Sequence, residues 1–351
     1  MTLLTLALDL GVSRATVSNA YNRPDQLSPT LRARILARAE ELGFAGPDPM
    51  ARGLRRGRVS AVGVLVDEGL SYAFSDPTTV LFLDGLAREL QLDGLGLLLH
   101  AAGGQDADIR PIRDAAVDAW VVQSLPDGHP AVAAVLTRGR PIVVLDQPAL
   151  PGIPLVGIDD EAGARAAVEH LLGLGHRRLA VLTMPLQAGG REGVADARRQ
   201  QEVTYAVMRR RLAGAAAAAA TAGVPWDQVR VVECTANDPD TAARAVADLL
   251  TAPDAPTAVF ACSDQLALGV LRAARGAGLR VPDDLSVVGF DDSPSAAGAE
   301  PPLSTVAQPL RERGQAVGAL VRALLRGEDV SSPAVFPVQL VLRGSTGPTE
   351  A

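Results

Sequence analysis

Several strand-like runs of this chain are followed by polar or aromatic side chains that could bind a small, hydroxyl-rich molecule. The runs are apolar and rich in valine, and they span 61–66, 119–122, 142–145, 257–261 and 285–289. The residues that follow them are Tyr72, Phe74, Asp76, Ser124, Asp146, Asp264 and Asp291. Carboxylates accept hydrogen bonds from hydroxyls, and aromatic rings offer flat apolar faces. We therefore expect these residues to line a ligand pocket.

Two of these groups also have a structural interpretation. Tyr72, Phe74 and Asp76 could form a loop that packs on its own lobe, although pocket lining is favoured in a chain with only 3% aromatic residues. Asp264 stands before the helical run 265–278 and could cap its N-terminus. Both alternatives remain open at this point.

The elements that must position these residues alternate between strands and helices from about residue 60. Eight strand candidates span 61–66, 95–99, 119–122, 142–145, 177–183, 229–233, 257–261 and 285–289. Such runs are typical of parallel strands buried on both faces, with crossover helices such as 161–175 between them. A break at 151–159 predicts two similar α/β lobes with the ligand between them, beyond the carboxyl ends of the strands.

Other kinds of site find little support in the sequence. No GxGxxG or GxxxxGK[ST] motif follows a strand, so we expect no nucleotide cofactor. No GxSxG or HExxH motif supports an enzyme. Cys234 and Cys262 are far apart and are interpreted as buried neutral thiols. The four histidines have no ligand or nucleophile at a recognisable spacing, so we expect no metal; they are His100, His129, His170 and His176.

The first 22 residues have the pattern of a helix-turn-helix. Thr2 can cap a first helix whose apolar residues recur at three- and four-residue spacing, and Gly11 supplies a tight turn. Ser13 can cap a second helix that runs through about Tyr21, with Val17 facing inward. An ordinary amphipathic helical hairpin would show similar spacing.

The second helix would present Arg14, Ala15, Ser18 and Asn19 on its outward, N-terminal side. A recognition helix offers its first turns to the base edges in the major groove of DNA. Arg14 could read guanine there through its O6 and N7 atoms. A third helix comes next, capped by Ser28, and the segment GPDPMARGLRRGR at 46–58 precedes the first strand.

Motifs along the whole chain resemble those of the LacI/GalR family of bacterial transcriptional regulators. They are Gly11-Val12-Ser13, Thr16-Val17-Ser18, Asn22, Glu41-Leu42-Gly43-Phe44, Ala51-Arg52-Gly53-Leu54, Gly175-His176-Arg177-Arg178, Ser263-Asp264-Gln265-Leu266-Ala267-Leu268-Gly269, Val281-Pro282-Asp283-Asp284, Pro302-Leu303-Ser304-Thr305-Val306 and Leu342-Arg343-Gly344-Ser345-Thr346. Their order along the chain makes the resemblance specific. It implies a helix-turn-helix headpiece at 1–45, a hinge at 46–58, and at 59–351 a two-lobed, periplasmic-binding-protein-like domain that binds effector and dimerises.

The resemblance also assigns site residues. Ser13, Thr16, Ser18 and Asn22 would mainly hold DNA phosphates, while Leu54, flanked by Ala51 and Arg52, would wedge into the minor groove. Asp146, Arg211 and Asp291 match effector-contacting positions, and Ser263 and Asn237 are weaker matches. Arginine and carboxylates together can bind vicinal hydroxyls, so a sugar is the first expectation and a nucleobase or nucleoside the second.

Charge is distributed unevenly along the chain. Residues 1–58 hold nine arginines and five acidic residues, a net charge of +4 in a chain of −7, so the remainder carries −11. A basic headpiece on an acidic body is consistent with binding DNA through one end. The arginines within 187–210 are interpreted as a solvated helix face.

These observations predict a DNA-binding repressor controlled by a small molecule, and not an enzyme. A solute-binding protein would explain only the pocket, and the sequence shows no export signal. We expect a cytoplasmic homodimer on a near-palindromic operator, without membrane contact. The last residues, LVLRGSTGPTEA, contain no leucine heptads of the kind that build tetramers.

Overall fold

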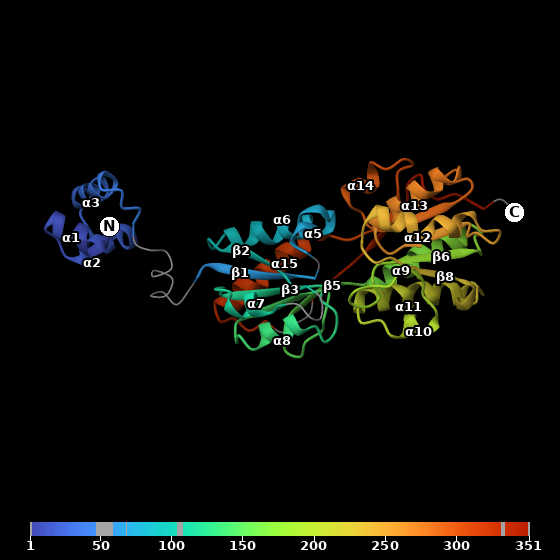
Figure 1. Ribbon diagram of the computed structural model, residues 1–351, viewed down its shortest axis with the longest axis horizontal. Coiled ribbons are helices and arrows are strands. Elements are labelled where there is room, and N and C mark those ends of the chain that lie inside the picture. The colour runs from blue at the N-terminus through green and yellow to red at the C-terminus, as the bar shows by residue number, and fades with distance from the viewer. Residues whose placement is uncertain (1, 47–58, 68, 104–107, 331–333, 350–351) are drawn as a thin grey trace. The chain divides into compact units, whose positions relative to one another are not determined.

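The computed structural model describes residues 2–46, 59–67, 69–103, 108–330 and 334–349 (Figure 1). They form two compact units, Met1–Ser60 and Ala61–Ala351. The hinge residues predicted to contact DNA, Ala51, Arg52 and Leu54, lie outside the described residues.

The first unit is helical, and the predicted capping residues begin its helices. Its elements are α1 (Leu3–Leu10), α2 (Arg14–Asn22), the 3-10 turn η1 (Pro24–Gln26) and α3 (Pro29–Glu41). Thr2, Ser13 and Ser28 each accept a hydrogen bond from a backbone N–H of the first turn, as predicted. Gly11 ends α1 with φ of 66°, a left-handed conformation that glycine adopts without strain.

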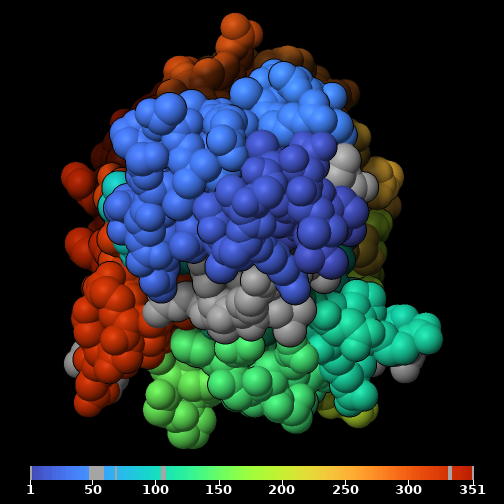
Figure 2. All heavy atoms as spheres, turned by 90° about the vertical axis from the view of Figure 1, so that its left-hand side faces the viewer, coloured from blue at the N-terminus to red at the C-terminus, as the bar shows by residue number. Residues whose placement is uncertain are grey.

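A small core joins these three helices. Its buried members come two from each helix, and they are Leu6, Ala7, Val17, Ala20, Ile35 and Ala39. Arg38 of α3 pairs with Asp9 of α1 at 2.7 Å on the surface of the unit. Figure 2 shows the unit in blue as a closely packed body. The helical hairpin is therefore fixed from behind by α3, which leaves the outward side of α2 open.

The second unit contains two mainly parallel sheets, as predicted. The first sheet has the order β12-β5-β4-β3-β1-β2 and is parallel throughout, and the second has the order β13-β11-β10-β9-β6-β8-β7. In the second sheet β13 and β7 pair antiparallel with their neighbours. The strands are β1 (Ala61–Val66), β2 (Gly96–Ala101), β3 (Ala119–Gln123), β4 (Ile142–Leu145), β5 (Leu155–Ile158), β6 (Leu179–Thr183), β7 (Gly193–Val194), β8 (Arg230–Glu233), β9 (Ala258–Ala261), β10 (Ser286–Asp291), β11 (Ser304–Ala307), β12 (Ala334–Phe336) and β13 (Gln339–Val341).

Helices cover both sheets. Those that pack on the first sheet are α5 (Leu70–Ser75), α6 (Pro77–Gln91), α7 (Arg110–Asp114), α8 (Pro130–Leu136) and α15 (Leu310–Leu325). The second lobe holds α9 (Asp160–Gly173), α10 (Ala197–Gln201), α11 (Ala206–Thr221), the 3-10 turn η2 (Trp226–Gln228), α12 (Pro239–Thr251), α13 (Asp264–Gly276) and α14 (Pro294–Ala297). No described helix is long and apolar enough to cross a bilayer.

The chain passes between the lobes three times. It leaves the first sheet after β5, returns from β11 to α15, and leaves again between β12 and β13. Figure 1 shows the consequence: α15, drawn in red near the end of the chain, lies beside β1 and α6. Each lobe is thus assembled from distant parts of the sequence.

The eight predicted strands are all present, with ends shifted by at most two residues. Five others were not predicted: β5, β7, β11, β12 and β13. They are two to four residues long and are interrupted by glycine or polar residues or are shorter than one full strand period, and β5 occupies the stretch interpreted as a break between lobes.

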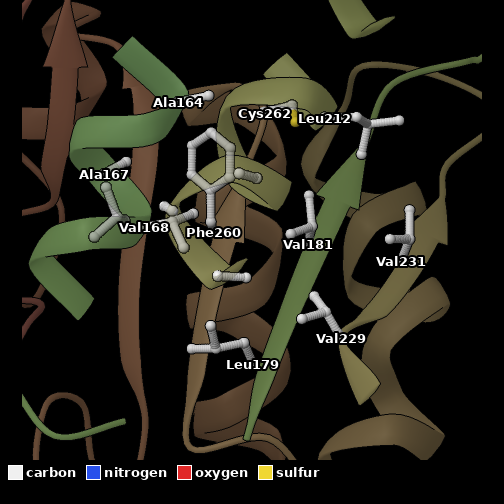
Figure 3. Close-up of a cluster of buried hydrophobic side chains, with 14 of the residues drawn as sticks. Ala164, Ala167, Val168, Leu179, Val181, Leu212, Val229, Val231, Phe260 and Cys262 are labelled. Carbon is white, nitrogen blue, oxygen red and sulfur yellow. The ribbon is translucent and has the colours of Figure 1, made fainter. Parts of the chain in front are cut away.

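The core of the second lobe explains why the sequences of its strands are continuous apolar runs. Val181, Val231 and Phe260 come from neighbouring strands and are almost completely buried. Figure 3 shows Ala164 and Val168 of α9 facing the ring of Phe260. Because helices cover both faces, few strand positions reach water.

Two helices of the first lobe approach each other through glycines. A Cβ added to Gly314 of α15 would lie 2.2 Å from the carbonyl oxygen of Phe82 in α6, and one at Gly85 would lie 2.1 Å from that of Arg311. Real Cβ atoms do not come that close to a carbonyl oxygen. The backbones of α15 and α6 therefore touch, which fixes α15 firmly against the sheet that carries the candidate site.

Candidate functional site

The helix-turn-helix places the predicted DNA-binding residues of the headpiece on and around α2. Ser13, Arg14 and Ala15 are exposed at its N-terminal end, while Val17 and Ala20 point into the core. Within the described residues, no ion pair or side-chain hydrogen bond is found for Arg14. Its guanidinium is available for an outside acceptor.

Hydrogen bonds within the headpiece hold the other candidates in place. Ser13 Oγ accepts from the backbone N–H of Thr16 at 3.0 Å. The amide of Asn22 donates to the carbonyl oxygen of Ser18 at 3.0 Å, and that of Asn19 donates to Gln26 at 3.2 Å. These polar side chains are therefore preorganised around the first turns of α2.

A cavity of about 480 Å³ lies in the second unit, where strands of both sheets end. It is lined by residues of both lobes, among them Val66, Asp67, Tyr72, Asp76, Thr79, Phe82, Gln123, Ser124, Asp146, Gln147, Met184, Tyr205, Met208, Arg211, Asn237, Asp291, Gln308 and Arg313. Four of these are carboxylates and two are arginines. The volume suits a molecule of the size of a mono- or disaccharide or a nucleoside.

Seven of the ten predicted effector residues line this cavity. They are Tyr72, Asp76, Ser124, Asp146, Arg211, Asn237 and Asp291. Phe74, Ser263 and Asp264 do not. The fold thus brings residues as distant as Tyr72 and Asp291 to one place from their positions after strands.

The structure does not place Phe74 at the cavity, because its segment is helical. Residues 70–75 form α5, and two positions along a helix differ by about 200° in direction. Tyr72 faces the cavity, whereas Phe74 is 70% exposed on the outside. Asp76 comes next as the N-cap of α6, where its Oδ2 accepts from the N–H of Thr79 at 2.9 Å.

Ser263 and Asp264 stand behind the cavity wall. Ser263, and not Asp264, is the N-cap of α13, and its hydroxyl also donates to Asn237 at 2.5 Å. Asp264 is buried and accepts from the N–H of Ser293 at 2.7 Å and the hydroxyl of Thr305 at 2.5 Å. Asp264 therefore neither lines the cavity nor caps α13: it connects the segment after β10 to β11.

A chain of four side chains crosses the cavity from one lobe to the other. Asp146, after β4, pairs with Arg313 of α15 and accepts from Ser124 at 3.1 Å. Arg313 donates to Gln308, whose amide donates to Asp291 at 2.7 Å. The two carboxylates at the ends of β4 and β10 are thus connected through α15 and the segment before it.

Arg211 is a further charged neighbour of Asp291. Its Nε donates to the buried Asp160 at 2.9 Å, and its guanidinium stacks 3.6 Å above the ring of Phe290. Burial raises the pKa of Asp291 well above its usual value, while Arg211 partly offsets that effect. The arrangement gives the second lobe a rigid donor beside a carboxyl group.

Three further hydrogen bonds connect the lobes around the cavity. The amide of Asn237 donates to the hydroxyl of Tyr72 at 2.8 Å, and Gln147 accepts from the backbone N–H of Val207 at 2.8 Å. Tyr205 donates its hydroxyl to Asp67, whose pKa is raised by burial. The lobes are therefore held together around the ligand space by side chains that also line it.

Backbone strain concentrates at the same strand ends. Ser124, Asp146, Asp291 and Asp292 have positive φ values of 55°, 65°, 121° and 54°. Only one other described non-glycine residue, Ser60, shows a positive φ. Non-glycine residues adopt this region at a cost, and such outliers cluster at functional sites.

Several lining residues were not predicted. Asp67 directly follows β1, Gln123 ends β3, and Gln147 lies two residues after β4. Examining the polar residues at every predicted strand end would therefore have found them. Gln308 and Arg313 belong to a crossover into a helix. No pattern in the sequence indicates that they reach the cavity.

The charged stretch at 187–210 is only partly a solvated face. Arg198 is largely exposed, as predicted. Arg199 is not: its side chain is 16% exposed and pairs with the buried Glu233. Glu233 also accepts from the N–H groups of Leu186 and Arg191, each at 3.0 Å, because the loop wraps around this carboxylate.

The two cysteines are buried, and His176 is bound into the second lobe by hydrogen bonds. Burial raises the pKa of the Cys234 and Cys262 thiols to about 12, which keeps them neutral. His176 bonds to Thr257 and Ser286, each at 3.0 Å. Over the described ranges, no group of three or more His, Cys, Asp or Glu side chains could hold a metal ion.

Known proteins share this architecture along nearly the whole chain. A family profile described as a periplasmic binding protein-like domain matches residues 168–346. The HTH-type transcriptional regulator Rv3575c of Mycobacterium tuberculosis is 42% identical over 324 residues, 91% of this chain and 90% of that protein. The HTH-type transcriptional regulator IpsA of Corynebacterium glutamicum is 38% identical over 94% of this chain and 92% of its own.

Solved structures of transcriptional regulators have the same fold along nearly the whole chain. A LacI-family regulator from Corynebacterium glutamicum matches with a TM-score of 0.76 and 32% identity, covering 99% of this chain and 98% of its own. The regulator CelR in complex with cellobiose matches with a TM-score of 0.72 and 29% identity, covering 98% of this chain and 99% of its own. The lac repressor dimer bound to operator and the anti-inducer ONPF matches with a TM-score of 0.78 and 25% identity, covering 99% of each chain.

A helix-turn-helix unit joined to a two-lobed ligand-binding unit defines an effector-controlled, DNA-binding transcriptional regulator. Within that class, this chain belongs to the LacI/GalR family. The predicted resemblance and fold class are thereby confirmed.

Proposed function

We propose that this protein represses transcription as a homodimer on a near-palindromic operator, and that a neutral, hydroxyl-rich molecule bound in the cavity changes its affinity for DNA. Residues 1–45 would bind DNA, 46–58 would form the hinge, and 59–351 would bind effector and dimerise. A regulator of this kind works in the cytoplasm, where the chromosome is.

The observation that carries the effector class is the set of hydrogen-bond acceptors and cations in the cavity wall. Four carboxylates line it against two arginines, and each arginine already pairs with a carboxylate, Arg211 with Asp160 and Arg313 with Asp146. No lining cation in the described residues is therefore left for a phosphate or a carboxylate ligand. Hydroxyl groups, which donate to carboxylates, fit this wall. The solved structure of CelR, which has the same fold, is a complex with cellobiose.

A nucleoside is the second candidate. Tyr72, Phe82 and Tyr205 line the cavity and could stack on a base, while the carboxylates would receive the ribose hydroxyls. An enzyme or a solute-binding protein would leave the headpiece without a purpose.

A thermal-shift screen of sugars and nucleosides, followed by operator binding with each ligand that stabilises the protein, tests the proposal. We expect one ligand class to raise Tm and to change the affinity for operator. Because the second unit has its own cores, a chain without residues 1–58 should lose operator binding and retain the ligand. Loss of both activities, or ligand binding without any change in operator affinity, would contradict the proposal.

A further inference from the structure

Arg313 is a buried cation at the floor of the cavity. It lies in the first turn of α15, is 3% exposed and lines the ligand space. The close contact between α15 and α6 at Gly314, the next residue, fixes the backbone that carries it. Its guanidinium is therefore held in one place by the fold.

The guanidinium determines where the carboxylate of Asp146 points. Arg313 binds Oδ1 of Asp146, and Ser124 donates to Oδ2 at 3.1 Å. Asp146 itself has a left-handed backbone, φ 65°. A carboxylate held at both oxygens presents its remaining lone pairs in fixed directions.

Arg313 also determines how Gln308 is oriented. A guanidinium only donates, so the carbonyl oxygen of Gln308 must face Arg313, and the amide nitrogen must face Asp291. The amide donates to Oδ1 of Asp291 at 2.7 Å. Through Gln308, Arg313 of the first lobe thus orients the carboxyl group of Asp291 in the second lobe.

One donor of this arginine has no acceptor. Nε of Arg313 is buried and has no hydrogen-bond partner among the described residues. A buried donor without a partner is unfavourable. Because this Nε has almost no accessible surface, the guanidinium is held by its bonds to Asp146 and Gln308.

We propose that Arg313 is a specificity-determining residue of the effector site: it sets Asp146 of one lobe and Asp291 of the other to receive two hydroxyls of a single uncharged polyol. This inference rests on the proposed function. It adds the residue that selects the ligand class, and it connects ligand binding to contact between the lobes.

The test compares Arg313→Met with Arg311→Met in the full-length protein. Met keeps much of the volume of arginine but removes the charge. Arg311, on the same helix, pairs with Asp84 on the surface and does not line the cavity. Binding of D-ribose, D-glucose, cellobiose and adenosine is measured by calorimetry for each protein, and operator binding and Tm report on folding.

For the ligand that binds wild type best, Arg313→Met should weaken binding by about 10- to 100-fold, the effect of losing charged hydrogen bonds. Arg311→Met should change it by less than about twofold, as an exposed pair contributes little. In an Asp146→Asn background, Arg313→Met should weaken binding less than it does in the wild-type background, because only its effect on Asp291 through Gln308 remains. A purely structural role would give the same loss in both backgrounds.

Equal losses in the two backgrounds, an unchanged affinity for Arg313→Met, or a similar loss for Arg311→Met would overturn the inference while leaving the proposed function intact. If Arg313→Met does not fold, Arg313→Lys keeps the charge but cannot reach both partners, and the same comparison applies. Wild type that binds none of the four compounds would overturn the proposed ligand class and this inference with it.

Discussion

Two buried aspartates of the second lobe illustrate how surroundings decide what a carboxylate does. Asp160 is completely buried and pairs with Arg210 and Arg211. Asp264 is buried without a cation, and its partners are a backbone N–H and a hydroxyl. Desolvation therefore raises the pKa of Asp264 to about 6.

This raised pKa predicts a pH window in stability. The folded state holds the proton of Asp264 up to about pH 6, whereas the unfolded state releases it near its ordinary value of 3.8. The contribution of this group to stability is thus present below about pH 4 and is lost as pH rises to about 6. In urea unfolding, the difference in free energy between Asp264→Asn and wild type should shift in favour of the variant over this range. Parallel pH profiles would show that the group titrates normally.

In the headpiece, the exposed and unpaired Arg14 is the residue best placed to read a base. Arg14→Ala should cost about 1–3 kcal/mol of operator binding and relax the preference at one position in each half-site. Binding measured on a set of operators mutated at single positions tests this. A uniform loss on every operator would instead make Arg14 a phosphate contact.

Site residues that come directly after a strand were easier to predict from the sequence than site residues carried by a helix. Asp146 and Asp291 were found because parallel strands end at one edge. Arg313 was not, since its place in the cavity depends on a crossover and on the contact of α15 with α6. Phe74 was misplaced because six residues, 70–75, are too few to show helical periodicity.

Among the elements, the pair α15 and α6 is sensitive to the addition of one methyl group. Gly314→Ala should destabilise the protein by about 1–3 kcal/mol, because its Cβ would meet the backbone of α6 and the helices must separate. It should also weaken effector binding, since Arg313 moves with α15. Chemical denaturation and calorimetry measure the two effects.

Gly276 provides the control for this substitution. It ends α13 on the surface, and a Cβ there would meet no atom within 4 Å. Gly276→Ala should leave stability unchanged or raise it by about 0.5–1 kcal/mol. Equal destabilisation by both variants would mean that helix contact is not the cause.

The elements also show where sequence patterns end. Strands made of continuous apolar residues and amphipathic helices were predicted, because their hydrophobic pattern is visible in the sequence. The two- to four-residue strands β5, β7 and β11–β13 were not, since tertiary pairing alone makes them strands. The consequence for the site is small, as its side chains mostly come after the longer strands.

For the whole molecule, oligomeric state is the decisive property. One headpiece contacts too little DNA for tight binding, and a two-fold dimer reads a near-palindrome. We expect sedimentation at micromolar concentration to give twice the 36.3 kDa of one chain. A monomer that binds operator with full affinity would contradict this.

The three crossings between the lobes have a consequence for the order in which the protein can fold on the ribosome. The headpiece is complete once residue 60 has been made. The first lobe is not, since it needs α15 and β12, which are among the last residues synthesised. Until then Phe82 and Leu86 of α6 lack the helix that covers them. The nascent chain therefore carries an open hydrophobic face through most of translation, the kind of surface that chaperones recognise.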